Sequence, residues 1–188
     1  SLLGDWNYKI EAIIKGTLNK NVTSLAGVPS WMLVLLNKIL EKSNKKYISE
    51  LWPNLEVYFH GGVSFKPYIN QYRSIINSKS MQYYEIYNAS EGFFAIQCEN
   101  NSNELLLMLD YGIFYEFISM KTYGSKDEKI IPLSEVEKDI NYAILITTNA
   151  GLWRYKIGDT VKFTSLNPYK IIVSGRTKHY INVFGEEV

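Results

Sequence analysis

The sequence predicts an α/β protein in which a βαβ unit precedes an antiparallel, barrel-like region of strands. Apolar and polar side chains alternate over residues 55–60, and a Gly-Gly pair, a helical repeat from Pro67 and a second alternating stretch over residues 82–87 follow. Strand, helix and strand in this order are typical of a parallel sheet. Beyond Gly92, short apolar runs are separated by turn residues, as in antiparallel sheets. We therefore expect the architecture to change near Gly92.

The composition fits a folded protein with a balanced charge. The 188 residues are 46% hydrophobic and 14% aromatic, enough for one sizeable core or two small domains. Twenty basic and nineteen acidic residues leave a net charge of +1, which gives no electrostatic reason to expect nucleic acid or an anionic membrane as partner. Cys98 is the only cysteine, and no apolar run approaches the ~20 residues that span a bilayer. We expect a soluble cytoplasmic protein without disulfides.

Helices are expected before and within the βαβ unit. Asp5 is suited to cap a helix that places Trp6, Ile10, Ile13 and Ile14 on one face. The small residues of 23–27 indicate a loop. Pro29 then suits the first position of the next helix, whose apolar residues repeat at helical spacing from Trp31 to Leu40. A short helical turn over residues 48–52 should end at Pro53.

The second half predicts strands joined by short turns. Residues 105–109 and 113–118 should form a hairpin through the turn at 110–112, and residues 126–129 a solvated charged loop. Residues 142–148 should form a strand that turns at 149–151 into residues 152–155, and Gly158-Asp159 should break the chain. Further strands are expected at residues 161–164, 170–174 and 180–184.

The first candidate site is the sequence YNASEG at residues 87–92, which joins two predicted strands. It combines a hydroxyl, a carboxylate and a glycine within four positions, and a carboxylate at a strand end can face a cleft or bind a cation. Taken alone, a plain hairpin turn with a solvated Glu91 explains it equally well. However, Gly61-Gly62 and Ser90-Glu91-Gly92 would both follow the carboxyl ends of strands, where parallel sheets bind ligands.

Two further candidate sites lie near the end of the chain. Asp159, in GLWRYKIGD at residues 151–159, can accept two hydrogen bonds from a vicinal diol such as that of ribose, although Gly-Asp is also common in ordinary turns. Arg176 can pair with phosphate or ribose oxygens, or lie at the surface as a single arginine often does. His60 and His179 lack neighbours at metal-ligand spacing, and no Walker loop, nucleophile elbow or Rossmann fingerprint is present.

Together these motifs resemble the adenylate-forming superfamily, which includes acyl-CoA synthetases, luciferases and peptide-synthetase adenylation domains. The finer features are similar to the auxin-responsive acyl-acid amido synthetases, the GH-three family, and the segment after residue 59 is similar to its bacterial branch. The resemblance covers the chain from about Thr23 to its end. It is carried by YNASEG at 87–92, GLWRYKIGD at 151–159, GRTK at 175–178, FYEFI at 114–118, TTNAGLWRY at 147–155 and HGGVSFKPY at 60–68.

The resemblance implies a role for each matching residue in binding ATP and a carboxylic acid. Tyr87 would lie against the adenine ring, Ser90 would contact phosphate, and Glu91 would act in catalysis by holding the Mg²⁺ that bridges the ATP phosphates. Gly61 and Gly62 would let the backbone approach the purine closely. Asp159 would hold the ribose hydroxyls, with Tyr155 and Arg176 beside it. Lys178 would be a hinge, and Val28 and Ser30 would border the acyl pocket.

The resemblance further implies that the chain is an internal piece of a larger enzyme. Residues 1–178 would be the carboxyl-side portion of its large domain, and 179–188 the start of a truncated hinge and C-terminal domain. The family's phosphate loop and catalytic lysine are absent from the sequence, so we expect the 188 residues alone to be inactive. The intact enzyme would join a small carboxylic acid to an amino acid. The alternatives are an acyl-CoA ligase and a non-catalytic nucleotide- or protein-binding module.

Overall fold

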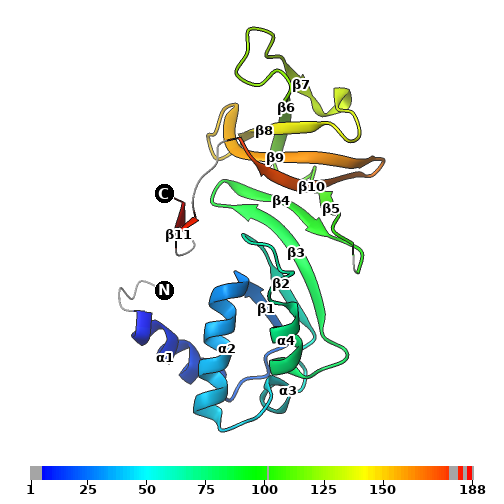
Figure 1. Ribbon diagram of the computed structural model, residues 1–188. Coiled ribbons are helices and arrows are strands. Elements are labelled where there is room, and N and C mark those ends of the chain that lie inside the picture. Colours follow the sequence, from blue (N-terminus) through cyan, green and yellow to red (C-terminus); the bar gives the residue numbers. More distant parts are fainter. Residues whose placement is uncertain (1–5, 101, 178–181, 184–185, 188) are drawn as a thin grey trace. The chain divides into compact units, whose positions relative to one another are not determined.

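The protein is described here from a computed structural model that places residues 6–100, 102–177, 182–183 and 186–187 (Figure 1). The chain divides into two compact units, Ser1–Ile86 (unit 1) and Tyr87–Val188 (unit 2). Unit 1 combines helices with parallel strands and unit 2 consists mainly of antiparallel strands, so the predicted α/β class and its order along the chain are confirmed. No helix in the described residues has both the length and the apolar character needed to cross a bilayer.

Unit 1 contains the predicted βαβ unit and one strand that the sequence did not predict. Strand β2 (Val57–His60) pairs in parallel with β3 (Gln82–Ala89), and helix α4 (Ile69–Ile76) connects them. On its other side β2 pairs in parallel with β1 (Ser24–Gly27), so the prediction of a loop at residues 23–27 was wrong. Strand β1 has no alternation of apolar and polar residues. Its backbone pairing with β2 makes it a strand.

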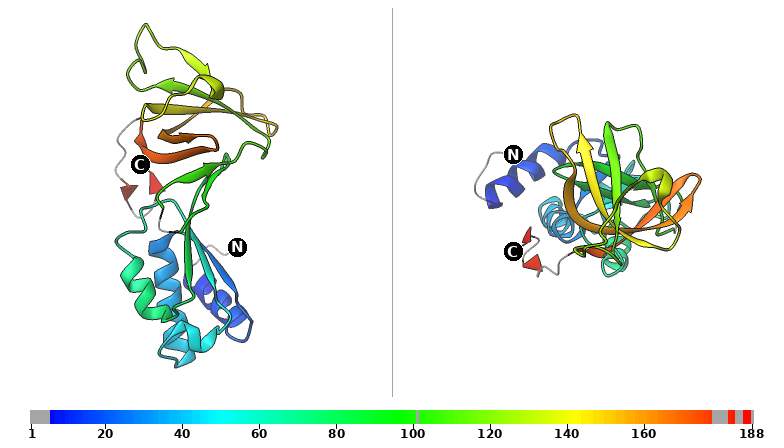
Figure 2. Two further views of the ribbon diagram at one scale, coloured as in Figure 1. Left: turned by 90° about the vertical axis from the view of Figure 1, so that its right-hand side faces the viewer. Right: turned by 90° about the horizontal axis from the view of Figure 1, so that it is seen from above.

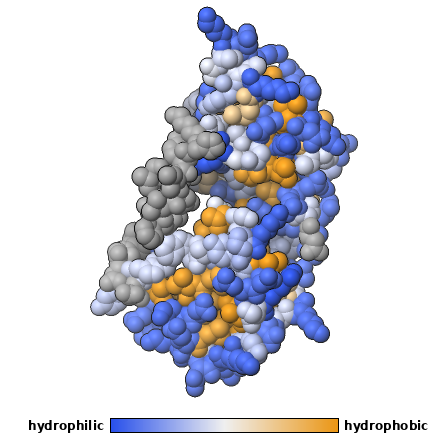
Figure 3. Space-filling view, viewed as in Figure 1, coloured by the Kyte–Doolittle hydropathy of each residue, from blue (hydrophilic) through white to orange (hydrophobic). Residues whose placement is uncertain are grey.

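The helices of unit 1 follow the predicted segments closely. They are α1 (Trp6–Thr17), α2 (Pro29–Ser43) and α3 (Ile48–Leu51), together with α4. Helices α2 and α4 each end on an asparagine in the left-handed conformation, Asn44 (φ 57°) and Asn77 (φ 54°), which terminates the helical hydrogen bonding. Apolar surface remains on this unit (Figure 3), and Trp31 and Val34 of α2 are both more than 40% exposed.

In α1 only part of the predicted apolar face is covered. Ile10 and Ile14 are buried, whereas Trp6 and Ile13 are exposed. Trp6 packs edge-on against Trp31 of α2 with 4.9 Å between ring centroids. Asp5, the predicted cap, lies outside the described residues.

Unit 2 is an antiparallel sheet in the order β4-β5-β10-β9-β8-β6-β7. The long strands β8, β9 and β10 lie side by side in the views of Figures 1 and 2. Phe117, Tyr142 and Phe163 pack edge to face at the centre of its core, with centroids 5.2–6.1 Å apart. The strands are β4 (Gly92–Gln97), β5 (Leu105–Leu107), β6 (Ile113–Ser119), β7 (Ile130–Pro132), β8 (Asn141–Thr148), β9 (Tyr155–Leu166) and β10 (Tyr169–Arg176).

The predicted hairpin over residues 105–118 is absent from the described structure. Strand β5 pairs with β4 and β10, and β6 pairs with β8 and β7, so the turn at residues 110–112 joins strands that are not neighbours. The turn signal was correct, since Gly112 has a φ of 74°. A turn alone does not fix the partner of a strand, and here non-local pairing with β10 replaces the local pairing.

Strand β9 also differs from the prediction. It begins at Tyr155, so residues 152–154 lie in the turn after β8, and it continues through Gly158-Asp159 without a break. Gly158 has a φ of 94°, and the pairing with β8 shifts register opposite this point, which makes it a bulge. Of the strand expected at 180–184, only residues 182–183 are described, and they pair as β11 (Asn182–Val183) with β12 (Glu186–Glu187).

Candidate functional site

Three of the predicted site residues meet in unit 2. The hydroxyl of Tyr87 donates a hydrogen bond to Oδ2 of Asp159 at 2.8 Å, and Nε of Arg176 forms an ion pair with Oδ1 at 3.0 Å. We call Tyr87, Asp159 and Arg176 the triad. They come from β3, β9 and β10, and Asp159 and Arg176 are directly opposite each other in the β9–β10 pairing. The structure therefore brings together residues of all three sequence motifs.

The local backbone explains how Asp159 reaches its partners. The bulge at Gly158 changes the direction of the side chain that follows it. The carbonyl of Gly158 is held in place by Thr177, whose N–H and hydroxyl donate to it at 2.8 and 3.2 Å. Gly158 has a positive φ, which a residue with a side chain rarely adopts. Glycine at position 158 therefore allows the bulge that directs Asp159 toward Tyr87 and Arg176.

The chemistry of the triad suits a ligand with two neighbouring hydroxyls. Burial, together with the charge of Asp159 and the hydrogen bond to it, raises the pKa of Tyr87 well above its usual range, so the hydroxyl remains a donor. The Asp159 carboxylate has about four acceptor positions, of which Tyr87 and Arg176 use one on each oxygen. Its side chain is 18% exposed. It therefore keeps accessible capacity for a vicinal diol.

Tyr87 itself is mostly covered. The residue is 8% exposed, and its ring packs against Phe94 with 4.9 Å between centroids. The predicted contact with adenine stays a prediction, with only a small part of the ring available for it. Tyr155 is 41% exposed at the first residue of β9, and within the described residues no hydrogen bond or ion pair joins it to the triad.

Ser90 and Glu91 form the two-residue turn between β3 and β4 and follow Tyr87 by three and four positions in the chain. Ser90 is exposed and Glu91 is half-buried. A carboxylate oxygen is a ligand that Mg²⁺ prefers, so the residue type fits the predicted cation. In the described part of the chain no three His, Cys, Asp or Glu side chains cluster as a metal site. The role of Glu91 in holding Mg²⁺ stays a prediction.

The predicted site residues of unit 1 lie at the carboxyl ends of β1 and β2. A side chain at Gly61 would place its Cβ 2.4 Å from the carbonyl oxygen of Ile86, so the backbone of β3 leaves no space for one. Gly62 has a φ of 81°, and the position of its missing Cβ is 3.5 Å from Val28. The backbone structure therefore favours glycine at both positions, independently of any approach to a purine. Ser30, in the first turn of α2, is half-buried.

Sequence reasoning missed an ion pair that joins two of the family motifs. Nε and Nη2 of Arg154 each contact one oxygen of Glu116, both at 2.9 Å. Glu116 is 8% exposed within the sheet, whereas the side chain of Arg154 is 64% exposed. Arg154 has a φ of 45°, and its N–H donates to the hydroxyl of Thr147. A carboxylate within the otherwise apolar stretch FYEFI was the available signal.

His60 is buried between aromatic rings in unit 1. It is 3% exposed and stacks on Phe65 with 4.0 Å between centroids. Its Nδ1 has no hydrogen-bond partner among the described residues, and burial lowers the pKa of His60 to about 4. His60 is therefore neutral at physiological pH. His179 lies outside the described residues, as does Lys178, which is the predicted hinge.

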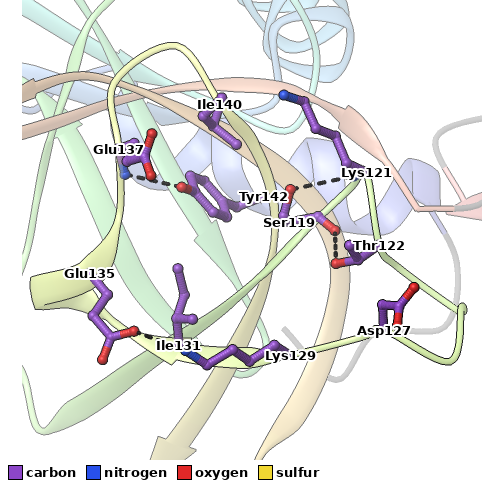
Figure 4. Close-up of a pocket in the computed structure, with 10 residues that line it drawn as sticks. All are labelled: Ser119, Lys121, Thr122, Asp127, Lys129, Ile131, Glu135, Glu137, Ile140 and Tyr142. Atoms are coloured by element: carbon purple, nitrogen blue, oxygen red, sulfur yellow. Dashed lines mark hydrogen bonds and ion pairs between the residues drawn. The ribbon is translucent and has the colours of Figure 1, made fainter.

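Unit 2 also contains a pocket of about 390 Å³, which involves none of the predicted site residues (Figure 4). Charged side chains form its rim, where Lys129 and Glu135 pair at 3.5 Å. Tyr142 lines it too, and its hydroxyl accepts a hydrogen bond from the N–H of Glu137. The other lining residues are Ser119, Lys121, Thr122, Asp127, Ile131 and Ile140.

Comparison with known proteins identifies relatives by sequence. The model of the GH3 family N-terminal domain matches residues 1–81, and that of the GH3 family central domain matches residues 106–176. Indole-3-acetic acid-amido synthetase GH3.4 of Arabidopsis thaliana is 25% identical over 88% of this chain and 31% of its own length. Jasmonoyl-L-amino acid synthetase JAR4 of Nicotiana attenuata is 28% identical over 84% of this chain and 30% of its own. The chain thus spans about a third of these relatives.

Solved structures share the fold. The GH3.15 acyl acid amido synthetase superposes with a TM-score of 0.70 at 16% identity, over 97% of this chain and 42% of that one. A 2-hydroxyisobutyryl-CoA ligase superposes with a TM-score of 0.67 at 14% identity, over 98% and 39% of the two chains. The fold of this chain matches the N-terminal domain of adenylate-forming enzymes. The two family models and the related amido synthetases show that the chain belongs to the GH3 family, and its fold is that of adenylate-forming enzymes.

Proposed function

We propose that this chain is part of an ATP-dependent acyl-acid amido synthetase. The observation that carries the proposal is the triad, because it joins three motifs around a carboxylate that can accept two hydroxyl donors. Membership of the GH3 family supports the reaction class, since the related proteins are named as amido synthetases of carboxylic acids. The proposed enzyme first activates a carboxylate with ATP and then transfers the acyl group to the amine of an amino acid.

In the proposed nucleotide site Asp159 holds the ribose hydroxyls. Arg176 orients the carboxylate and adds a contact of its own, while the hydroxyl of Tyr87 orients Asp159 from the other side. Tyr87 remains our candidate for contact with the adenine. Ser90 contacts phosphate and Glu91 holds Mg²⁺. Held by Glu91, the ion would supply positive charge to offset the charge that develops on the phosphates.

The proposed reaction has two steps. An oxygen of the carboxylic acid forms a bond to the α-phosphorus of ATP as the bond from that phosphorus to pyrophosphate breaks, which gives the acyl-adenylate. The amine nitrogen of the amino acid then attacks the acyl carbon, AMP leaves, and the amine loses a proton. Val28 and Ser30 border the acyl pocket in this proposal. The purine contacts of Gly61 and Gly62, the role of Tyr155 beside the ribose and the hinge at Lys178 stay predictions.

The second candidate function is an acyl-CoA ligase of the same superfamily. The fold shared with the 2-hydroxyisobutyryl-CoA ligase favours it, because adenylate formation is common to both reactions. The two differ in the acceptor, which is a thiol in one and an amine in the other. A non-catalytic binding module would form no adenylate at all.

Acid-dependent exchange of labelled pyrophosphate into ATP tests the first step. The complete enzyme that contains this chain should exchange label with at least one member of a panel of aryl and alkyl acids. Mass spectrometry of the products with amino acids and with CoA then separates amide from thioester. The 188 residues alone should show no exchange above background and at most weak binding of AMP. If the complete enzyme exchanges no label with any acid, adenylation is refuted.

A further inference from the structure

The turn between β1 and α2 is held by side chains from other elements of unit 1. Val28 is the residue that precedes α2, and it makes no side-chain hydrogen bond to the helix start. Valine is a poor capping residue because its side chain has no acceptor for the free N–H groups. The position of this turn therefore depends on contacts from elsewhere.

Two buried tyrosines supply those contacts. The hydroxyl of Tyr58, on β2, lies 2.9 Å from the carbonyl oxygen of Gly27, and the hydroxyl of Tyr72, on α4, lies 2.8 Å from that of Pro29. These are the carbonyls on either side of Val28. Both tyrosines are fully buried, their rings stack with 4.9 Å between centroids, and their hydroxyls are 3.2 Å apart.

The two hydroxyl protons of Tyr58 and Tyr72 determine the direction of their hydrogen bonds. Two hydroxyl protons serve three contacts, so both carbonyls can be satisfied only when each tyrosine donates to its own carbonyl. Burial raises the pKa of Tyr58 to about 12 and that of Tyr72 further, so both remain donors. The pair thus attaches the turn to β2 and α4 at two adjacent points.

The turn lies where a ligand is expected to bind. The strands β1 and β2 are parallel, and ligands of such sheets bind beyond the carboxyl ends of the strands. Val28 follows the end of β1 and Gly62 follows the end of β2. The two residues are also close in space, since the position of a Cβ on Gly62 is 3.5 Å from Cγ2 of Val28.

We propose that Tyr58 and Tyr72 are positioning residues that set the shape of the acyl pocket by fixing Val28 and the start of α2. This inference rests on the proposed function, because it takes the ligand at this turn to be the carboxylic acid. The tyrosines do not touch the acid. They hold the backbone that does, so loss of one hydroxyl should change recognition of the acid more than that of ATP.

The test compares Tyr58→Phe, Tyr72→Phe and Tyr142→Phe in the complete enzyme by pyrophosphate exchange. Tyr142 is a matched control, because it is buried in unit 2 and also loses a single hydrogen bond to a backbone group. We expect each of the first two variants to raise the KM for the acid about five- to tenfold, the equivalent of one hydrogen bond, with kcat and the KM for ATP within about twofold. Tyr142→Phe should leave the KM for the acid unchanged.

Urea unfolding of the same variants separates positioning from folding. An unchanged KM for the acid in folded Tyr58→Phe and Tyr72→Phe would overturn this inference and leave the proposed function intact. Loss of folding in both variants, or an equal rise of both KM values, would also overturn it, because the tyrosines would then be purely structural. Absence of exchange in the unmodified enzyme would overturn the proposed function and this inference with it.

Discussion

Replacing His60 with phenylalanine should change how the stability of unit 1 depends on pH. Phenylalanine keeps the aromatic stacking on Phe65 and removes the buried nitrogen that has no hydrogen-bond partner in the described part of the chain. Burial lowers the pKa of His60 from its ordinary 6.5 to about 4 in the folded protein. Between these values the unfolded chain binds more protons than the folded chain, so the free energy of unfolding falls as the pH is lowered through this range.

The size of the effect follows from the same two values. At about 1.4 kcal/mol for each pH unit between 6.5 and 4, the full loss is about 3 kcal/mol, of which about 2 kcal/mol is reached between pH 7 and pH 4.5. Urea unfolding should be followed by tryptophan fluorescence, since the buried Trp52 reports on unit 1. With a slope of about 2 kcal/mol per M urea, the difference amounts to about 1 M in the unfolding midpoint.

The contributions of the other titrating groups cancel when His60→Phe is compared with the unmodified protein, because both proteins contain those groups. Glu85 lies opposite His60 in the β2–β3 pairing, and burial raises its pKa, which is opposed by Lys66. Its contribution has the opposite sign, since a raised carboxyl pKa favours the folded protein at low pH, and it is present with and without His60. His179→Gln serves as the control for the second histidine of the chain. If His60→Phe and the unmodified protein lose the same stability between pH 7 and pH 4.5, the reasoning is wrong.

Five substitutions test other features of the structure. Arg154→Ala should lower the free energy of unfolding by about 3 kcal/mol, because it leaves the buried carboxylate of Glu116 without its cation. Glu116→Gln should lower it by only about 1 kcal/mol. A larger loss for Glu116→Gln than for Arg154→Ala, measured by urea unfolding and circular dichroism, would contradict this. Asp159→Ala in the complete enzyme should weaken ATP binding by about 1–3 kcal/mol, and unchanged affinity by calorimetry would remove Asp159 from the site. Gly61→Ala should destabilise the protein, because the new Cβ would lie 2.4 Å from a backbone oxygen of β3. Gly16 has open space around it in α1, so Gly16→Ala should stabilise the protein by about 0.5–1 kcal/mol. Equal melting temperatures for the two variants would refute this.

Elements with a local signal could be predicted from the sequence. Alternation along β2 and β3, the proline at the start of α2 and the asparagines that end α2 and α4 depend on residues close in the chain. Strand β1 has small residues without a pattern, and only its pairing with β2 reveals it. The partners of β5 and β6 depend on which strand reaches them, and no residue within the turn between them carries that information.

The candidate site could be predicted as residues and not as contacts. Tyr87, Asp159 and Arg176 were each identified by family motifs, but the hydrogen bond between Tyr87 and Asp159 spans 72 positions of the chain. The ion pair between Glu116 and Arg154 spans 38, and neither partner was assigned a role. The bulge at Gly158 was read as a break, since a positive φ is equally compatible with a turn and with a continuing strand.

The place of β10 in the sheet has a consequence for biosynthesis. It lies between β5 and β9, although it is the last strand of that sheet to be synthesised. As the chain leaves the ribosome, β5 therefore has an unpaired edge until residues 169–176 emerge. Residues 1–86 form a compact unit of their own, and compact units generally fold as units during synthesis. During that interval the exposed edge of β5 is open to pairing with other chains, which makes it a site of possible aggregation.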